Sequence, residues 1–221
     1  MDKTKGYWLV ALLLVVLTSY FRLEEYYLLI SFIIIGLIII PQYKQFEKSK
    51  LNSRNIVVSA LIIAIASASR LPFATIPNVQ PVSMIVILTG YIFGANTGFI
   101  VGSMTAIVSN MILGQGPWTP WQMVAWGMMG FFSSYIAKIK VNKKLILSIY
   151  GFIWGILFGW MMNMWFLLGF IRPLNLKTIL AAFTASLYFD ILHAFANLFF
   201  IYLFHDALMK KFKRIKDKYK L

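Results

Sequence analysis

A ten-residue break separates two apolar runs of the chain: Leu113-Gly114-Gln115-Gly116-Pro117-Trp118-Thr119-Pro120-Trp121-Gln122. Its glycines and prolines prevent one helix from running through it, so the apolar runs on either side are separate segments. Its larger side chains are indoles and neutral amides; the amides both donate and accept hydrogen bonds. Such a stretch is typical of a membrane–water interface, where Trp is enriched. It is equally typical of a cap over a ligand cavity, and the stretch alone leaves both interpretations open.

The composition of the whole chain decides the class of protein. Of its 221 residues, 60% are hydrophobic and 13% are charged, whereas an average soluble domain is about 45–50% apolar and about 25% charged. The sequence therefore predicts an integral membrane protein. The net charge of +14 would suggest nucleic-acid binding in a soluble chain. Here the Lys and Arg residues cluster between and after the apolar runs, as the positive-inside rule requires, so we expect no nucleic-acid partner. The chain has no Cys, which excludes thiol catalysis, disulfides and Cys-ligated metals.

The apolar runs predict about eight membrane-spanning helices, since a span needs about 20 apolar residues and fewer where it is short or broken. Basic linkers follow the second and sixth runs, and a basic tail follows the last. This pattern predicts a plasma-membrane protein with both termini in the cytoplasm. Pro41 is expected to end the second span. The expected spans are residues 7–20, 26–40, 56–70, 82–93, 99–113, 121–137, 145–169 and 178–205.

Three loops with few charges are expected to converge on the exterior face: the Pro-rich segment (residues 71–81), the Gly/Trp segment (residues 114–122) and the turn at residues 169–177. The span after the Pro-rich segment is too short for the hydrocarbon core, which is about 30 Å thick. Irregular backbone at membrane depth is tolerated only where it is buried in protein or lines a cavity. The sequence therefore favours a binding cavity that opens to the exterior.

Polar residues inside the expected spans are costly in lipid and should face the bundle interior or a water-filled space. Asp190, His193 and Asn197 are spaced i, i+3 and i+7, which places them on one helix face; Asn110 and Asn163 lie in other spans. These residues are either a helix-to-helix hydrogen-bond cluster, a row of ligand contacts, or an ion or proton site. One Asp and one His are too few ligands for a metal site, and the absence of a nucleophile elbow speaks against an enzyme.

A stripe of small residues, Ala60, Ala64 and Ala68, repeats at i, i+4 and i+8 in the third expected span. Small residues let another helix approach closely. The stripe therefore serves either packing within the bundle or docking of a separate membrane partner. The chain also lacks a Gly-rich phosphate loop ending in Lys-Ser or Lys-Thr, so it has no nucleotide motor of its own.

Several stretches together resemble a known family. They are Asn78-Val79-Gln80-Pro81-Val82, Thr89-Gly90-Tyr91-Ile92-Phe93-Gly94-Ala95, Gly98-Phe99-Ile100-Val101-Gly102-Ser103 and the Gly/Trp segment. They are similar to the substrate-binding (S) component of energy-coupling factor (ECF) vitamin transporters. The resemblance covers residues 54–221 and implies a six-helix substrate-binding unit. Residues 1–53, a two-helix hairpin and a basic linker, depart from that pattern and have no assigned role.

The resemblance implies that the outer loops capture a vitamin and that the bundle topples in the membrane to deliver it. The energy then comes from a transmembrane coupling subunit and two ATPase subunits, with Ala60, Ala64 and Ala68 as the docking stripe. Amide and indole side chains suit a large, near-neutral ligand, and the pattern looks more like the cobalamin-type members than like the riboflavin or biotin types. The alternatives are another vitamin or a queuosine-like precursor, or a membrane-embedded enzyme or assembly factor that uses Asp190 and His193. We expect no cofactor. The candidate substrate-binding residues are Arg70, Asn78, Gln80, Asn110, Gln115, Trp118, Trp121, Gln122, Asn163, Asp190 and His193.

Overall fold

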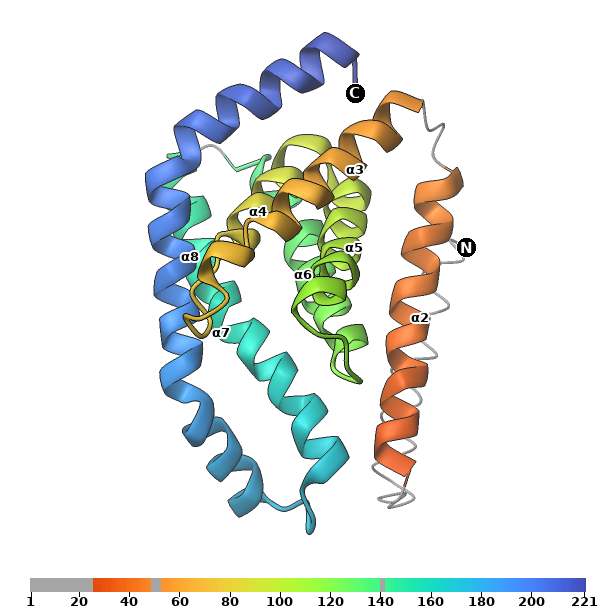
Figure 1. Ribbon diagram of the computed structural model, residues 1–221, viewed down its shortest axis with the longest axis vertical. Coiled ribbons are helices and arrows are strands. Elements are labelled where there is room, and N and C mark those ends of the chain that lie inside the picture. Colours follow the sequence, from red (N-terminus) through yellow and green to blue (C-terminus); the bar gives the residue numbers. More distant parts are fainter. Residues whose placement is uncertain (1–25, 49–52, 140–141) are drawn as a thin grey trace.

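The computed structural model describes residues 26–48, 53–139 and 142–221, and this part of the chain consists of helices joined by short connections, with no strand (Figure 1). The expected all-α membrane fold is therefore confirmed. The first expected span, residues 7–20, lies outside the described residues. The helices are α2 (Tyr27–Lys48), α3 (Ser53–Ala68), the short 3-10 helix η2 (Leu71–Phe73), α4 (Val82–Phe93), α5 (Ala95–Leu113), α6 (Thr119–Ile136), α7 (Lys143–Phe170) and α8 (Leu176–Tyr219).

Among the described residues, 5 helices are long and apolar enough to cross a bilayer. The short span expected after the Pro-rich segment is also present, as α4 with its 12 residues. At about 1.5 Å per residue α4 covers roughly 18 Å, which is less than the hydrocarbon thickness of about 30 Å. The chain is therefore a multi-pass membrane protein that contains one incomplete crossing. The long apolar helices lie at Leu29–Lys48, Ser53–Phe73, Ala95–Leu113, Lys143–Phe170 and Leu176–Tyr219.

Two helix ends differ from the expected ones. The prediction that Pro41 ends its span is wrong, because α2 continues through Pro41 to Lys48. In lipid, leaving the helix would expose several backbone N–H and C=O groups, which costs more than the one hydrogen bond that a proline removes. The Gly/Trp segment is irregular only as far as Trp118, because α6 begins at Thr119 with Pro120 in its first turn. A proline is tolerated there, since the N–H it lacks would have no helical partner.

The short helix α4 lies at the centre of the bundle, in contact with α3, α5, α6, α7 and α8, and nearly all of its residues are buried. Its backbone meets those of α5 and α6 where Gly90, Gly98 and Gly130 face one another. A Cβ atom on any of the three would overlap the backbone of a neighbouring helix. Glycine at this crossing therefore lets three helices approach more closely than any larger residue would allow.

A second glycine contact joins α7 to α8. Gly151, Gly155 and Gly159 recur every four residues on the face of α7 that α8 covers. A Cβ on Gly155 would overlap the backbone of Ala194, and a Cβ on Gly159 would overlap the Asp190 carboxylate. This stripe fixes how deeply α8 sits against α7, and it thereby brings the polar residues of α8 close to α7.

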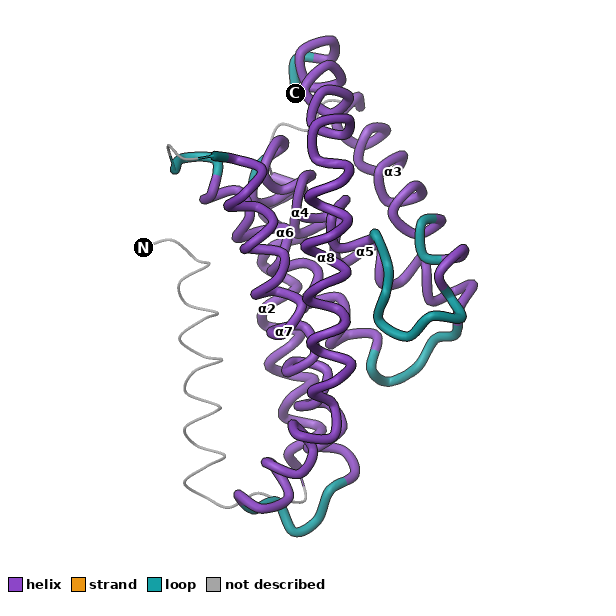
Figure 2. Tube along the Cα trace, turned by 90° about the vertical axis from the view of Figure 1, so that its left-hand side faces the viewer, coloured by secondary structure: helices purple, strands orange, loops and turns teal. Residues whose placement is uncertain are grey.

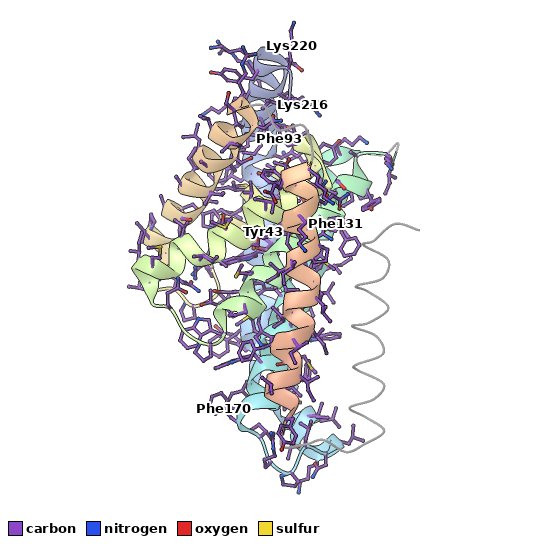
Figure 3. All side chains as sticks on the ribbon, turned by 90° about the vertical axis from the view of Figure 1, so that its right-hand side faces the viewer. Tyr43, Phe93, Phe131, Phe170, Lys216 and Lys220 are labelled. Atoms are coloured by element: carbon purple, nitrogen blue, oxygen red, sulfur yellow. The ribbon has the colours of Figure 1, made fainter. Side chains whose placement is uncertain are left out.

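The two ends of the bundle differ in shape. At one end, α7 and α8 project beyond the Pro-rich and Gly/Trp segments (Figures 1 and 2). The prediction that three loops converge is therefore wrong for the α7–α8 turn, because α7 has 28 residues and outreaches the 19 residues of α5. At the other end, where α2 ends at Lys48, the last part of α8 turns across the bundle (Figure 1). Figure 3 shows Lys216 and Phe93 at that end and Phe170 at the opposite one.

Candidate functional site

Arg70 stands at the centre of a buried hydrogen-bond network, two residues after the end of α3. Its Nε donates to Gln80 Oε1 at 2.7 Å, and its Nη1 donates to Asn110 Oδ1 at 2.9 Å and to Ser109 Oγ. The guanidinium carbon lies 4.9 Å from the ring centroid of Trp126. The residue is 7% exposed, and no carboxylate of the described residues forms an ion pair with it. Neutral acceptors and an aromatic face therefore hold this buried charge.

Asn110 extends this hydrogen-bond network to the Gly/Trp segment. Its Nδ2 donates to Gln122 Oε1 at 2.7 Å and to Thr119 Oγ1 at 3.1 Å. The Thr119 hydroxyl in turn donates to Gln115 Oε1 at 2.9 Å. We call Arg70, Gln80, Ser109, Asn110, Thr119 and Gln122 the arginine network. It ties together the end of α3, the Pro-rich segment, α5 and the start of α6.

The aromatic face under Arg70 belongs to a column of stacked rings. The Trp126 and Phe158 rings have centroids 5.4 Å apart at 27°, and the Phe158 and His193 rings have centroids 5.0 Å apart at 5°. His193 Nε2 lies 3.2 Å from the hydroxyl of Ser83 on α4, within hydrogen-bond distance. This aromatic column of Trp126, Phe158 and His193 connects α6, α7 and α8 through the centre of the bundle.

A cavity of about 250 Å³ lies against Phe158 and His193, at the end of the column remote from Trp126. Ligand pockets are typically about 300–1,000 Å³, so this cavity suits a small ligand. The Pro-rich segment, α7 and α8 form its walls, and the Gly/Trp segment contributes none of the lining residues. The cavity is lined by Asn78, Phe158, Gly159, Met162, Asn163, Ser186, Phe189, Asp190 and His193.

One edge of the cavity is polar. Asn163 Nδ2 donates to Ser186 Oγ at 2.6 Å, and the Ser186 hydroxyl donates to Asp190 Oδ2 at 2.9 Å. Asp190 is 2% exposed, and in the described ranges no Lys, Arg or His forms an ion pair with it. Asn78 lines the cavity from the Pro-rich segment, and its Nδ2 donates to the backbone carbonyl of Phe189 at 3.1 Å. An ionisable group that is buried at membrane depth without an ion-pair partner is a candidate functional residue.

The side chains that line this cavity offer groups that suit the binding of a small molecule. Phe158 and His193 present flat ring faces, and Asn163, Ser186 and Asp190 offer amide, hydroxyl and carboxylate groups to a ligand. Within the described residues, no three His, Cys, Asp or Glu side chains group together as metal ligands would. The site therefore combines aromatic area with a few placed polar groups, which is the usual composition of a small-molecule pocket.

The structure divides the candidate site residues into three groups. Arg70, Gln80, Asn110 and Gln122 form the arginine network, and Gln115 joins it through Thr119. Asn78, Asn163, Asp190 and His193 line the cavity. Trp118 and Trp121 belong to neither group: Trp118 meets Trp165 edge-on with centroids 5.7 Å apart, and the Trp121 indole Nε1 is buried without a hydrogen-bond partner.

Asn197 shows the role of helix packing that the sequence left open. Its Nδ2 donates to the backbone carbonyl of Gly151 at 3.1 Å, which joins α8 to α7. Asp190 and His193, on the same helix face, line the cavity instead.

The sequence did not identify Ser186, Trp126 and Phe158 as residues of the site. Ser186 had a usable signal, because it precedes Asp190 by four residues and therefore shares its helix face. Trp126 and Phe158 had none, since an aromatic residue within an apolar run is indistinguishable from ordinary core. Only the packing of α6, α7 and α8 brings their rings together.

The small-residue stripe lies on the outer face of α3. Ala60, Ala64 and Ala68 are all exposed, as are the neighbouring Leu61 at 52% and Ile65 at 49%. The opposite face of α3 packs into the bundle through residues such as Ile62 and Ala66. The stripe therefore takes no part in packing within the described bundle, which leaves this apolar face open to lipid or to a partner.

Comparison with known proteins gives one match. A family model described as "ECF-type riboflavin transporter, S component" matches residues 50–214. No curated protein and no solved structure matches the chain. The matched range begins just before α3 and ends within α8, so it contains the arginine network, the aromatic column and the cavity.

Proposed function

Because the chain belongs to the family of ECF-type riboflavin transporter S components, we propose that its cavity captures riboflavin or a closely related flavin for ATP-driven uptake. Membership in this family makes the chain a membrane-embedded substrate-binding subunit of a transporter, and we propose no enzymatic role for it. The observation that carries the proposal is the cavity against Phe158 and His193, with its polar edge at Asn163, Ser186 and Asp190.

The chemistry of a flavin matches these walls. Riboflavin has a flat tricyclic ring, an imide edge that donates and accepts hydrogen bonds, and a chain of hydroxyl groups. Aromatic side chains pack against flat rings in offset or edge-on arrangements, and Phe158 and Phe189 supply such surfaces. The polar edge supplies partners for the hydroxyl groups or the imide. A volume of about 250 Å³ requires that the cavity widen slightly or leave part of the ligand outside, as in pockets that bury about 70–90% of a ligand's surface.

Cobalamin, the substrate that we expected from the loop residues, is the second candidate. Trp118 and Gln115 lie on the outer part of the Gly/Trp segment, where an indole and an amide could cover a large ligand with many amides. The cavity argues for the flavin, because a corrinoid is several times larger than riboflavin and would have to rest mainly on the outer loops.

Partner subunits would supply the energy for transport. The sequence has no phosphate-binding loop, so a transmembrane coupling subunit and two ATPase subunits would supply the energy. The docking site would be the exposed stripe of Ala60, Ala64 and Ala68, since small residues allow a partner helix to approach closely. The end of the bundle at Lys48 and Lys216 would then face the cytoplasm, in keeping with the positive-inside rule.

The test is direct ligand identification. The chain is purified in detergent, its bound small molecules are identified by native mass spectrometry, and riboflavin binding is followed by quenching of flavin fluorescence. We expect saturable binding of one riboflavin, weakened by Phe158→Ala and unaffected by Phe132→Ala, a matched change of an exposed ring.

A competition assay separates the two ligands. Excess cobalamin should leave riboflavin binding unchanged. If the chain retains cobalamin in preference to riboflavin, and Trp118→Ala abolishes that binding, the second candidate replaces the first. Binding of neither molecule would reject both.

A further inference from the structure

Arg70 occupies the junction between the exposed helix α3 and the ligand cavity. The outer face of α3 carries Ala60, Ala64 and Ala68, all exposed, and two residues after its end the buried Arg70 enters the arginine network. Arg70 is not among the cavity-lining residues. Arg70 therefore lies between the outer face of α3 and the ligand cavity and is part of neither surface.

Two routes of contact lead from Arg70 to the cavity. The first runs through Gln80, which accepts from the Arg70 Nε at 2.7 Å and stands two residues after Asn78, a lining residue. The second runs through Trp126, which lies 4.9 Å under the guanidinium and stacks on Phe158, the aromatic wall of the cavity. A movement of Arg70 would thus reach both the Pro-rich segment and the cavity wall.

We propose that Arg70 is a positioning residue that couples α3 to the ligand cavity, so that partner docking at α3 and ligand binding in the cavity change each other's affinity. This inference rests on the proposed function, since it requires both a ligand and a docking partner. Arg70 touches neither of them and acts through Gln80 and Trp126.

The physical reason lies in the geometry of the guanidinium group. Its planar fork holds three acceptors in fixed directions, and no described carboxylate offers it an alternative partner. A buried charge that leaves its hydrogen-bond partners is costly. When α3 shifts or tilts, Arg70 therefore has to carry Gln80 and the Trp126 ring with it, or the shift is opposed.

Lysine cannot replace this function. Its ammonium is a compact point charge, which is strongly hydrated and lacks the planar fork. Arg70→Lys keeps the positive charge but gives up the simultaneous contacts with Gln80, Asn110 and the face of Trp126. Gln80→Leu removes a single contact, on the loop side, from a half-buried position.

The experiment measures coupling as a ratio of dissociation constants. Riboflavin binding to the full chain is titrated with and without the purified coupling module, and docking of the module is titrated with and without riboflavin. Linkage requires the same factor in both titrations, on the order of 5- to 150-fold for coupled sites. In Arg70→Lys we expect this factor to fall to within about twofold of one, while riboflavin binding to the isolated chain is largely kept.

Two further variants make the result decisive. Gln80→Leu should reduce the coupling factor in the same direction, and it serves if Arg70→Lys does not fold. Arg172→Lys, the same exchange at the exposed α7–α8 turn, should leave the factor unchanged. Full coupling in both network variants, or a wild-type factor of one, overturns the inference. A wild-type chain that neither binds riboflavin nor docks rejects the proposed function instead.

Discussion

At the scale of single residues, the bundle buries a basic and an acidic side chain, Arg70 and Asp190, which form no ion pair with each other. Arg70 is held by Gln80, Ser109 and Asn110, and Asp190 is held by Ser186. An ionisable side chain is costly to bury at membrane depth, and each of these two forms hydrogen bonds with neutral partners. A salt bridge between Arg70 and Asp190 would have satisfied both side chains and left neither available for the helix contacts or for a ligand. Because the two side chains are apart, Arg70 joins the end of α3 to the Pro-rich segment and α5, and Asp190 lines the cavity.

The role of Asp190 can be tested by its amide. Asp190→Asn keeps the shape of the side chain but replaces one acceptor oxygen with a donor, which conflicts with the Ser186 hydroxyl and with ligand donors. We expect riboflavin affinity to fall about tenfold, equivalent to about 1.4 kcal/mol, in the fluorescence titration. Asp206→Asn, the same change at an exposed position remote from the cavity, is the control. Equal affinity in wild type and Asp190→Asn would remove Asp190 from the binding site.

At the scale of helices, glycine determines how closely the elements pack. The stripe of Gly151, Gly155 and Gly159 lets α8 lie directly on α7, and this closeness places Asp190 and His193 at the cavity. In lipid, helix association depends on close packing, because apolar residues gain little by leaving apolar surroundings. The position of the cavity residues on α8 therefore depends on how closely α8 packs against the glycines of α7.

A matched pair of alanine substitutions tests this contact. In Gly155→Ala the added methyl would overlap the backbone of Ala194, so α8 has to move; in Gly36→Ala the nearest atom is Ile40 Cδ1 at 4.0 Å. We expect Gly155→Ala to lower the free energy of unfolding by about 1–3 kcal/mol, the usual cost of overpacking. Gly36→Ala should not destabilise the protein, since alanine is the better helix former. Thermal unfolding in detergent measures both, and equal stability would contradict the packing argument.

The outer face of α3 gives a second prediction at this scale. Ala64→Phe puts a large ring on the exposed stripe, which should prevent close approach of a partner helix. We expect co-purification with the coupling module to be lost while riboflavin binding stays within about twofold of wild type. Ala181→Phe adds the same ring to an exposed position of α8 and should not affect co-purification. Retained co-purification by Ala64→Phe would place the docking site elsewhere.

At the scale of the whole molecule, α8 connects the two ends of the bundle. It contributes Asp190 and His193 to the cavity, and its last part then crosses the opposite end (Figure 1). There Phe212 contacts Phe93 with ring centroids 5.8 Å apart, and Lys216 Nζ donates to the Ile92 carbonyl at 2.6 Å, at the end of α4. The buried Phe212 anchors this part, while its exposed residues, which include Lys210, Lys211 and Lys213, form a basic surface.

The attachment of this C-terminal part can be loosened without touching the cavity. Phe212→Ala removes the buried ring, which is 6% exposed, from the contact with α4. We expect faster amide hydrogen exchange after about residue 207 and unchanged riboflavin affinity. Lys213→Ala, an exposed neighbour, should exchange like wild type. An unchanged exchange pattern in Phe212→Ala would show that other contacts hold this part of α8.

Much of the fold was predictable from local sequence, because a lipid bilayer restricts the secondary structure that a spanning chain can adopt. Backbone groups in a bilayer must be satisfied internally, so apolar runs had to be helices, and the seven described helices α2–α8 match the last seven expected spans. The same reasoning identified Asn110, Asn163, Asp190, His193 and Asn197 as residues that avoid lipid; Asn163 is half-buried and the other four are buried. The prediction that a helix ends at Pro41 is wrong, because the one hydrogen bond that Pro41 removes costs less free energy than unwinding the helix in lipid would.

The sequence by itself determined the class of protein, the helices and the polar residues that must turn inward. Tertiary structure alone decided which of those residues meet. Arg70 and Asn110 are separated by 40 positions, and the aromatic column draws on three helices. Contacts between helices depend on the rotation and depth of each helix in the bundle. Close contacts such as those at Gly130 and Gly155 set that rotation and depth, and no periodicity within a single apolar run encodes them.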